Sequence, residues 1–75
     1  MPHVIVKMYR GRDEEVKQQM VDGIVKSITA SLDIGEGSVS VAVEEFEPER
    51  WNEEVYLPDI AQREDYLYKK PGYKP

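Results

Sequence analysis

Residues 13–32 read DEEVKQQMVDGIVKSITASL, and this stretch decides how the rest of the chain is organised. Apolar side chains recur in it at every fourth position, namely Val16, Met20, Ile24, Ile28 and Leu32. Such spacing predicts an amphipathic helix of about twenty residues. Asp13 is the predicted N-cap, and Glu14 and Glu15 place negative charge in the first turn, where the helix dipole favours it.

The end and the interior of this helix carry glycines. The segment DIGEG at residues 33–37 predicts the helix end, because its two glycines can adopt a positive φ. Gly23 lies inside the helix, where glycine costs about 1 kcal/mol relative to alanine. We therefore predict a close packing contact at Gly23.

Strand-like segments flank the helix on both sides. Residues 3–9, HVIVKMY, place Val4, Val6 and Met8 on alternate positions, and residues 38–46, SVSVAVEEF, restore the same period of two. A strand, a helix and a second strand form a β-α-β unit with parallel strands and a right-handed crossover. The predicted fold class is therefore α/β, a small β-α-β unit.

Such a unit is incomplete by itself. A two-stranded sheet under one helix leaves both sheet edges open and is rarely stable alone. The 75 residues include no cysteine and one histidine, so neither disulfides nor a His-rich metal site is available to stabilise a small core. We expect a second copy to complete a four-stranded sheet with two helices, which makes the protein a homodimer or a higher homo-oligomer.

The chain is expected to form a single domain over residues 1–75. Its β-α-β core occupies 2–46, and a short helix and a tail occupy 47–75. This last part contains too many apolar side chains for a disordered tail. Pro58 is placed in the first turn of the short helix, where proline is tolerated.

Charge and hydropathy exclude several classes of protein. The net charge is −5, whereas nucleic-acid binding depends on clustered Lys and Arg. No apolar run approaches the roughly 20 residues of a membrane span, and no signal-peptide pattern is present. We expect a cytoplasmic protein with neither nucleic acid nor membrane as a partner.

Several short motifs occur in a particular order. Met-Pro precedes the first strand, GR precedes the acidic helix start, and SLD and SVSV follow at fixed spacings. Together they resemble the 4-oxalocrotonate tautomerase family, without gaps from Pro2 to about Glu45. The stretch from EPERW to KKPGY resembles the dimeric branch of that family, whose members act on phenylenolpyruvate-like enols.

The resemblance implies a keto–enol tautomerase without metal or cofactor, acting on the enol of a 2-oxo monocarboxylic acid. Pro2, N-terminal once Met1 is removed, is the implied general base. Arg12 matches the family's arginine before the helix and binds the substrate carboxylate, and Trp51 matches the aromatic wall of the pocket. The family's second-strand arginine falls on Ser40, a candidate pocket residue, which argues against a dicarboxylate substrate.

The chemistry of these residue types fits those roles. An α-amino group has a pKa of about 7.7–8.0, and an apolar pocket with a nearby cation lowers it, so the base is neutral at pH 7. The planar guanidinium of Arg12 matches a carboxylate bidentately, and Arg10 is its alternative. His3 is expected to be a strand residue with a hydrogen-bond partner, with a catalytic role as the alternative.

Two other functions remain open at this point. Some relatives hydrate or dehalogenate unsaturated acids with a protonated proline and a carboxylate that activates water, a role that Glu53 or Glu54 can fill. A non-enzymatic oligomeric binding protein that retains the scaffold predicts no turnover at all.

Overall fold

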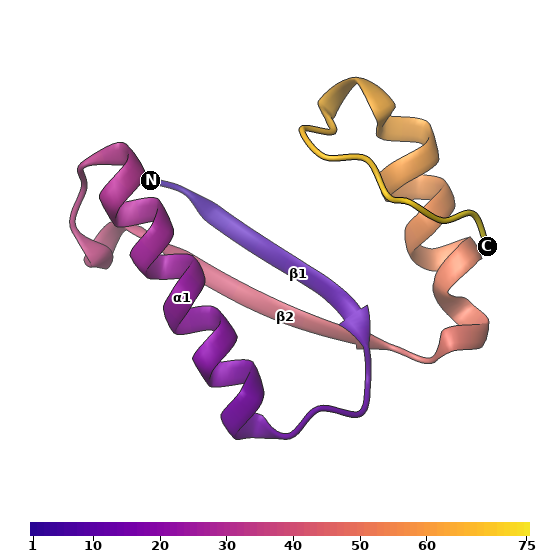
Figure 1. The fold of residues 1–75 in the computed structure, drawn as a ribbon, viewed down its shortest axis with the longest axis horizontal. Coiled ribbons are helices and arrows are strands. Elements are labelled where there is room, and N and C mark those ends of the chain that lie inside the picture. Colours follow the sequence, from indigo (N-terminus) through magenta and orange to yellow (C-terminus); the bar gives the residue numbers. More distant parts are fainter. The chain divides into compact units, whose positions relative to one another are not determined.

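The computed structural model describes the whole chain, Met1–Pro75, as two compact units, Met1–Glu45 and Phe46–Pro75 (Figure 1). The elements of the β-α-β part are β1 (His3–Tyr9), α1 (Glu14–Leu32), a 3-10 turn (Glu36–Ser38) and β2 (Ser40–Phe46). The two strands form one parallel two-stranded sheet, with α1 as the crossover between them (Figure 1). The predicted α/β class and β-α-β unit are confirmed.

Helix α1 begins where the sequence predicts. The Asp13 side chain accepts a hydrogen bond from the Val16 amide at 2.9 Å, which satisfies one of the amides that the first turn leaves without a backbone partner. Two acidic residues, Glu14 and Glu15, occupy the first turn, as the helix dipole favours. The predicted N-cap is confirmed.

The end of α1 differs from the prediction. Asp33, with φ 55°, adopts the left-handed conformation and donates its amide to the Thr29 carbonyl. Neither Gly35 nor Gly37 has a positive φ, so the prediction that these glycines end the helix is wrong. Aspartate tolerates this conformation because its short side chain can hydrogen-bond locally. A 3-10 turn follows, and β2 therefore starts at Ser40, two residues after the predicted start at residue 38.

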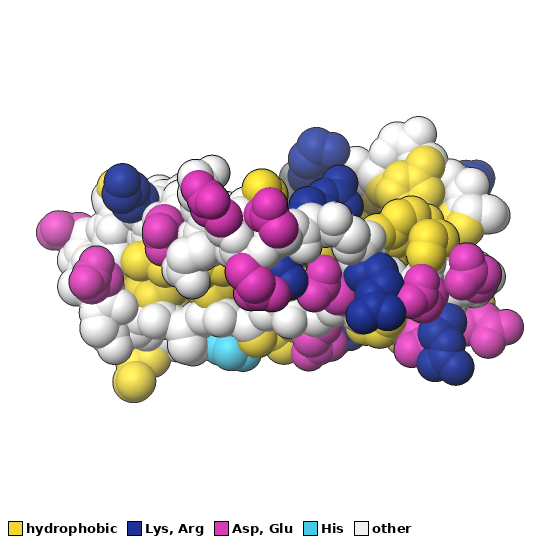
Figure 2. All heavy atoms as spheres, turned by 90° about the horizontal axis from the view of Figure 1, so that it is seen from below, with side chains coloured by type: hydrophobic (Ala, Val, Ile, Leu, Met, Phe, Trp, Pro, Cys, Tyr) yellow, Lys and Arg dark blue, Asp and Glu magenta, His cyan; other side chains and the backbone are white.

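The apolar layer of the first unit is only half covered. Val4, Val6 and Met8 on one face of β1 are half-buried, whereas Ile5 and Tyr9 on the other face are 50% and 43% exposed. No side chain of Met1–Glu45 is fully buried. Figure 2 shows hydrophobic side chains uncovered between charged ones, with acidic groups spread over the visible face.

Gly23, in the middle of α1, faces open space. An added Cβ at this position meets no atom within 4 Å, so the close packing contact predicted there is absent within the chain. The cost of a glycine inside α1 is therefore not offset by a contact with the sheet.

The second unit is helical and ends in an irregular tail. Its elements are a 3-10 turn (Pro48–Arg50), a π-helix (Asn52–Ile60) and a 3-10 helix (Ala61–Tyr66). Val55, at 3% exposure, is the one buried residue of the chain. No helix of the structure has the length and apolar character that crossing a bilayer requires.

Pro58 lies inside the π-helix, so its predicted place in the first turn is wrong. In an α-helix the proline ring clashes with the carbonyl four residues earlier. A π turn is wider than an α turn, and here the Ala61 amide reaches the Tyr56 carbonyl five residues back. This wider turn accommodates the proline ring. The first-turn position is taken instead by Pro48, in the preceding 3-10 turn.

The caps of α1 make a first prediction. Asp13→Ala removes the acceptor of the Val16 amide and is expected to lower the free energy of unfolding by about 1 kcal/mol. Asp33→Gly is expected to leave it unchanged or raise it, because glycine adopts a positive φ without steric cost. Urea titration at one fixed protein concentration measures both variants. An equal loss in the two variants contradicts these cap assignments.

Candidate active site

The candidate site residues of the first unit fall at opposite ends of the sheet. Parallel strands start at one end and finish at the other. Pro2 and Ser40 lie at the amino ends of β1 and β2, and Arg12 follows the carboxyl end of β1 (Figure 1). The structure therefore separates the predicted base from the predicted carboxylate-binding residue within one chain.

At the amino end, backbone and side chains bring three residues together. The half-buried Pro2 accepts a hydrogen bond at its carbonyl from the Ser40 amide at 3.2 Å. The Ser40 hydroxyl and the His3 Nδ1 share a hydrogen bond of 2.6 Å. His3 is thus a strand residue with a hydrogen-bond partner, as predicted, and the Ser40 hydroxyl beside Pro2 is already engaged.

At the carboxyl end, Arg12 lies exposed in the short loop between β1 and α1. Gly11 before it has φ 128°, a conformation that side chains rarely adopt, so this loop requires a glycine next to Arg12. The seven-residue β1, at about 3.3 Å per residue, separates Pro2 from Arg12 by about 20 Å. Arg10 belongs to the same loop and directly follows β1, so it too lies at the carboxyl end of the strand.

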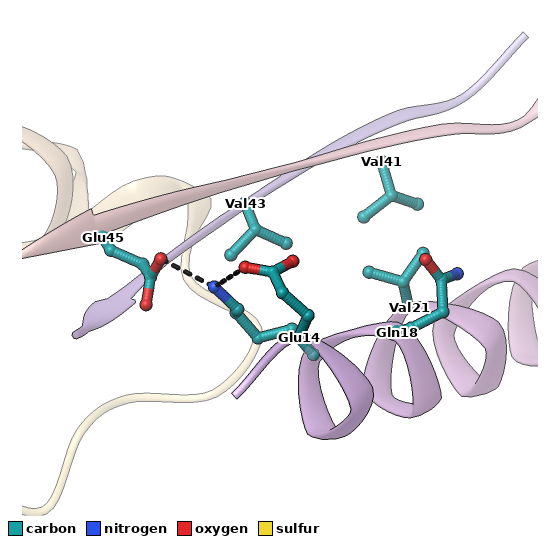
Figure 3. A pocket seen from close by; sticks show the side chains of 7 residues that line it. Glu14, Gln18, Val21, Val41, Val43 and Glu45 are labelled. Carbon is teal, nitrogen blue, oxygen red and sulfur yellow. Dashed lines mark hydrogen bonds and ion pairs between the residues drawn. The ribbon is translucent and has the colours of Figure 1, made fainter. Parts of the chain in front are cut away.

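A groove of about 370 Å³ lies at this end, between α1 and β2 (Figure 3). Val21 of α1 and Val41 and Val43 of β2 form its apolar part. Lys17 also lines the groove, and its ammonium forms ion pairs of 2.8 Å with Glu14 and with Glu45, drawn as dashed lines in Figure 3. The Lys17 side chain is only 13% exposed. Because its two partners lie on different elements, Lys17 connects the first turn of α1 to the end of β2.

These contacts set the charge state of the groove. The hydrogen bond that Lys17 donates to Glu14, followed by the one that it donates to Glu45, raises the pKa of Lys17 above its ordinary value of 10.5. Lys17 is therefore a fixed cation at neutral pH, which excludes it as a base there. The sequence analysis missed this cluster, although the spacing of Glu14 and Lys17 at i and i+3 was a visible signal.

Trp51 belongs to the second unit, and its surroundings are those of that unit. Its indole Nε1 donates a hydrogen bond of 2.8 Å to the hydroxyl of Tyr73, and its ring meets Phe46 edge-on at 6.2 Å. Tyr73 in turn contacts the Tyr56 ring at 5.7 Å. Sequence reasoning missed Tyr73, because the tail that carries it has no periodic pattern.

The two glutamates considered for water activation have polar surroundings. Glu54 forms an ion pair of 3.0 Å with Arg50, one helical turn earlier, and Glu53 is exposed. No group of three or more His, Asp or Glu side chains is arranged to hold a metal ion.

Comparison with known proteins identifies the family. The sequence model described as "Tautomerase enzyme" matches residues 2–55. The chain belongs to the tautomerase family. A probable tautomerase of Xylella fastidiosa is 40% identical over 73 residues, which are 97% of this chain and 89% of that protein. Tautomerase PptA of Cronobacter sakazakii is 40% identical over 75 residues, 99% of each chain.

Two crystal structures resemble this tautomerase. TomN, a 4-oxalocrotonate tautomerase homologue in the tomaymycin biosynthetic pathway, has a TM-score of 0.65 and 28% identity over 67% of this chain and 77% of its own. YwhB, a homologue of 4-oxalocrotonate tautomerase, has a TM-score of 0.59 and 30% identity over 61% of this chain and 75% of its own. The protein is thus an isomerase of the tautomerase class, built on this family's β-α-β fold.

The Lys17 ion pairs make a second prediction. Because the folded-state pKa of Lys17 is raised above 10.5, the stability that these pairs contribute is fully present below that pH and is lost as the pH rises through the raised value. Lys17→Gln is therefore expected to unfold at a lower temperature than the wild type at neutral pH, with a gap that shrinks above about pH 10.5.

Thermal unfolding of the two proteins, followed from about pH 7 to about pH 11.5, measures this gap. Lys74→Gln, which changes an exposed lysine of the tail in the same way, is the matched control and is expected to follow the wild type throughout. A gap for Lys17→Gln that stays constant to the highest pH shows that its cause is packing and not the ion pairs.

Proposed function

We propose that this tautomerase converts the enol of a 2-oxo monocarboxylic acid to its keto form, with the nitrogen of Pro2 as the proton shuttle. The observation that carries the proposal is the place of Pro2, half-buried directly before β1 in a member of this family. Met1 is 104% exposed, so its removal disrupts no packing. Removal converts the Pro2 nitrogen from an amide into a secondary amine.

The reaction needs no co-reactant. The neutral Pro2 amine accepts the proton of the enol hydroxyl, and the resulting enolate carries its negative charge on oxygen. Its electron pair then forms the C=O bond while C3 takes a proton from the prolinium, which restores the neutral amine. Arg12 holds the substrate carboxylate bidentately, and its positive charge stabilises the enolate.

The separation of Pro2 and Arg12 requires two copies of the chain in each site. Two-fold symmetry pairs an edge strand with its counterpart in antiparallel direction, so the amino end of β1 lies beside the carboxyl end of β1 in the second copy. Pro2 then meets Arg12 of the partner subunit. The same pairing completes a four-stranded sheet and covers apolar surface that the single chain leaves half exposed.

Two further residues define the proposed substrate. Ser40, with its hydroxyl bonded to His3 at 2.6 Å, offers a neutral polar surface where a dicarboxylate needs a second cation. Trp51 supplies an apolar wall, which favours an aryl substituent. Phenylenolpyruvate combines both features, one carboxylate and one aryl ring, and is the substrate that we propose to test.

The hydratase alternative has no observation in its favour. A water-activating carboxylate must lie in an apolar, enclosed setting beside the substrate, whereas Glu54 is paired with Arg50 and Glu53 is exposed to solvent. The curated relatives named above are tautomerases. We therefore retain the tautomerase reaction as the single proposal.

The first test of this proposal compares two forms of the protein. The form without Met1 is expected to ketonise phenylenolpyruvate, and a form that retains Met1 is expected to be nearly inert, because an amide nitrogen is not basic. Ultraviolet absorbance follows the reaction, and intact mass defines each form. Equal activity of the two forms excludes the Pro2 amine as the base.

Titration of ¹⁵N-labelled proline in the Met1-free form separates this mechanism from hydration. The tautomerase base must be free at neutral pH, so its pKa is expected to lie below the ordinary α-amino range of about 7.7–8.0. A midpoint above about 8.5, combined with loss of activity in Glu53→Gln or Glu54→Gln, supports the hydratase instead.

The second test addresses Arg12. Arg12→Ala removes a charged hydrogen bond of about 1.5–3 kcal/mol, so kcat/KM for phenylenolpyruvate is expected to fall roughly 10- to 150-fold. Arg10→Ala, two residues earlier, is the matched control, with a much smaller loss. An enol without a carboxylate is expected to be hardly affected by Arg12→Ala. An equal loss for both substrates makes Arg12 a structural residue.

Mixed oligomers test whether two copies share each site. Pro2→Ala is expected to be nearly inactive, and Arg12→Ala is expected to keep at most about a tenth of the wild-type activity. Unfolding and refolding them together forms sites that combine the intact Pro2 of one chain with the intact Arg12 of the other. For random pairing in two-fold dimers, about a quarter of the wild-type activity is expected. No recovery, despite dimers in sedimentation, contradicts a site shared between copies.

A further inference from the structure

The last nine residues have no regular secondary structure, yet they are folded back along their unit. The tautomerase family model matches residues 2–55, so this tail lies beyond that match, although the curated relatives align with it. Lys70 forms an ion pair with Glu64 at 3.3 Å. Three residues further on, the hydroxyl of Tyr73 accepts the hydrogen bond from the indole of Trp51, 22 positions earlier in the chain.

Tyr73 is held at both ends of its side chain. Its ring lies against Tyr56 of the π-helix, with centroids 5.7 Å apart and planes at 51°. Its hydroxyl lies 2.8 Å from the Trp51 Nε1. Because the ring is placed by one contact and the oxygen is used by another, Tyr73 connects the indole of Trp51 to the body of the helix.

The indole of Trp51 is in turn fixed in two respects. Its ring meets Phe46 edge-on, at an angle of 82°, which is a favourable aromatic geometry. An indole has one polar hydrogen, on Nε1, and it acts only as a donor. The acceptor of this hydrogen is the hydroxyl of Tyr73. Its position therefore selects one rotation of the indole ring.

We propose that Tyr73 is a positioning residue that fixes the indole of Trp51 as a wall for large apolar substituents, and so favours aryl over short aliphatic enols. The inference rests on the proposed function, in which Trp51 is the apolar wall of the pocket. It assigns to the tail a role in substrate choice.

Physical reasoning separates this role from simple packing of the tail. An indole that has lost the acceptor of its Nε1–H is held less firmly and must be ordered when an aryl group binds, and that entropic cost weakens binding. The indole does not touch the reacting atoms, so the rate of the bound substrate is unaffected. A short substrate does not contact the wall and is indifferent to its mobility. A packing defect, by contrast, lowers stability and acts on both substrates alike.

The test uses Tyr73→Phe in the full-length, Met1-free protein. This variant keeps the ring against Tyr56 and removes only the acceptor. For phenylenolpyruvate we expect kcat/KM to fall about 2- to 12-fold, the range of one neutral hydrogen bond, through a higher KM at unchanged kcat. For 2-hydroxypenta-2,4-dienoate, which lacks the aryl ring, we expect no change. Tyr68→Phe, the same change at an exposed position of the tail, is the matched control.

Two further readouts isolate the contact. Trp51 is the one tryptophan, so its fluorescence anisotropy is expected to fall in Tyr73→Phe and to stay constant in Tyr68→Phe. Trp51→Phe removes the donor, so adding Tyr73→Phe to it is expected to cause no further loss for phenylenolpyruvate. If the losses in kcat/KM of the two single variants multiply in the double variant Trp51→Phe/Tyr73→Phe, Tyr73 does not act through Trp51.

The outcomes distinguish this inference from the proposed function beneath it. A wild type that turns over phenylenolpyruvate while Tyr73→Phe matches Tyr68→Phe overturns the positioning role alone. Equal losses for the aryl and the short substrate overturn it as well. A Met1-free wild type without turnover overturns the proposed function and this inference together.

Discussion

The parallel crossover is the constraint on which the arrangement of this protein depends. A helix that joins two parallel strands must return the chain to the end of the sheet where it started, so both strands begin at one end. Pro2 and Ser40 therefore share the amino end, and Arg12 and the Lys17 ion pairs share the carboxyl end. Larger α/β proteins commonly bind ligands at the carboxyl ends of their strands. Here the proposed chemistry needs both ends, and one chain cannot bring them together.

What the sequence predicted correctly was encoded by local patterns. The four-residue period of α1 and the two-residue period of the strands each follow from side chains that are neighbours along one element. Asp13 was recognisable because a capping side chain acts within one turn. The errors were also local. The left-handed position was assigned to two glycines, whereas Asp33 adopts it. Pro58 was assigned to the first turn because a π-helix has no sequence signal of its own.

The contacts that sequence reasoning missed join distant positions. Lys17 and Glu45 are 28 residues apart, and Trp51 and Tyr73 are 22 apart, so no period in the sequence relates the members of either pair. Pro2 and Arg12 were proposed through resemblance to a family and not through geometry. Their separation follows from the length of β1, residues 3–9, which the sequence predicted correctly. Periodicity predicted the elements of this protein, whereas the partners of its charged and aromatic side chains required the fold.

The acidic surface has a consequence for how a substrate arrives. The chain carries a net charge of −5, with acidic side chains spread over the face seen in Figure 2, and the proposed substrate is an anion. Long-range repulsion then opposes encounter, and the attraction of Arg12 acts only at short range. Dissolved salt screens exposed charges beyond about 8–10 Å but affects an enclosed ion pair much less. Raising the ionic strength is therefore expected to speed capture of the proposed anion, the reverse of its effect on enzymes that steer their substrates by opposite charge.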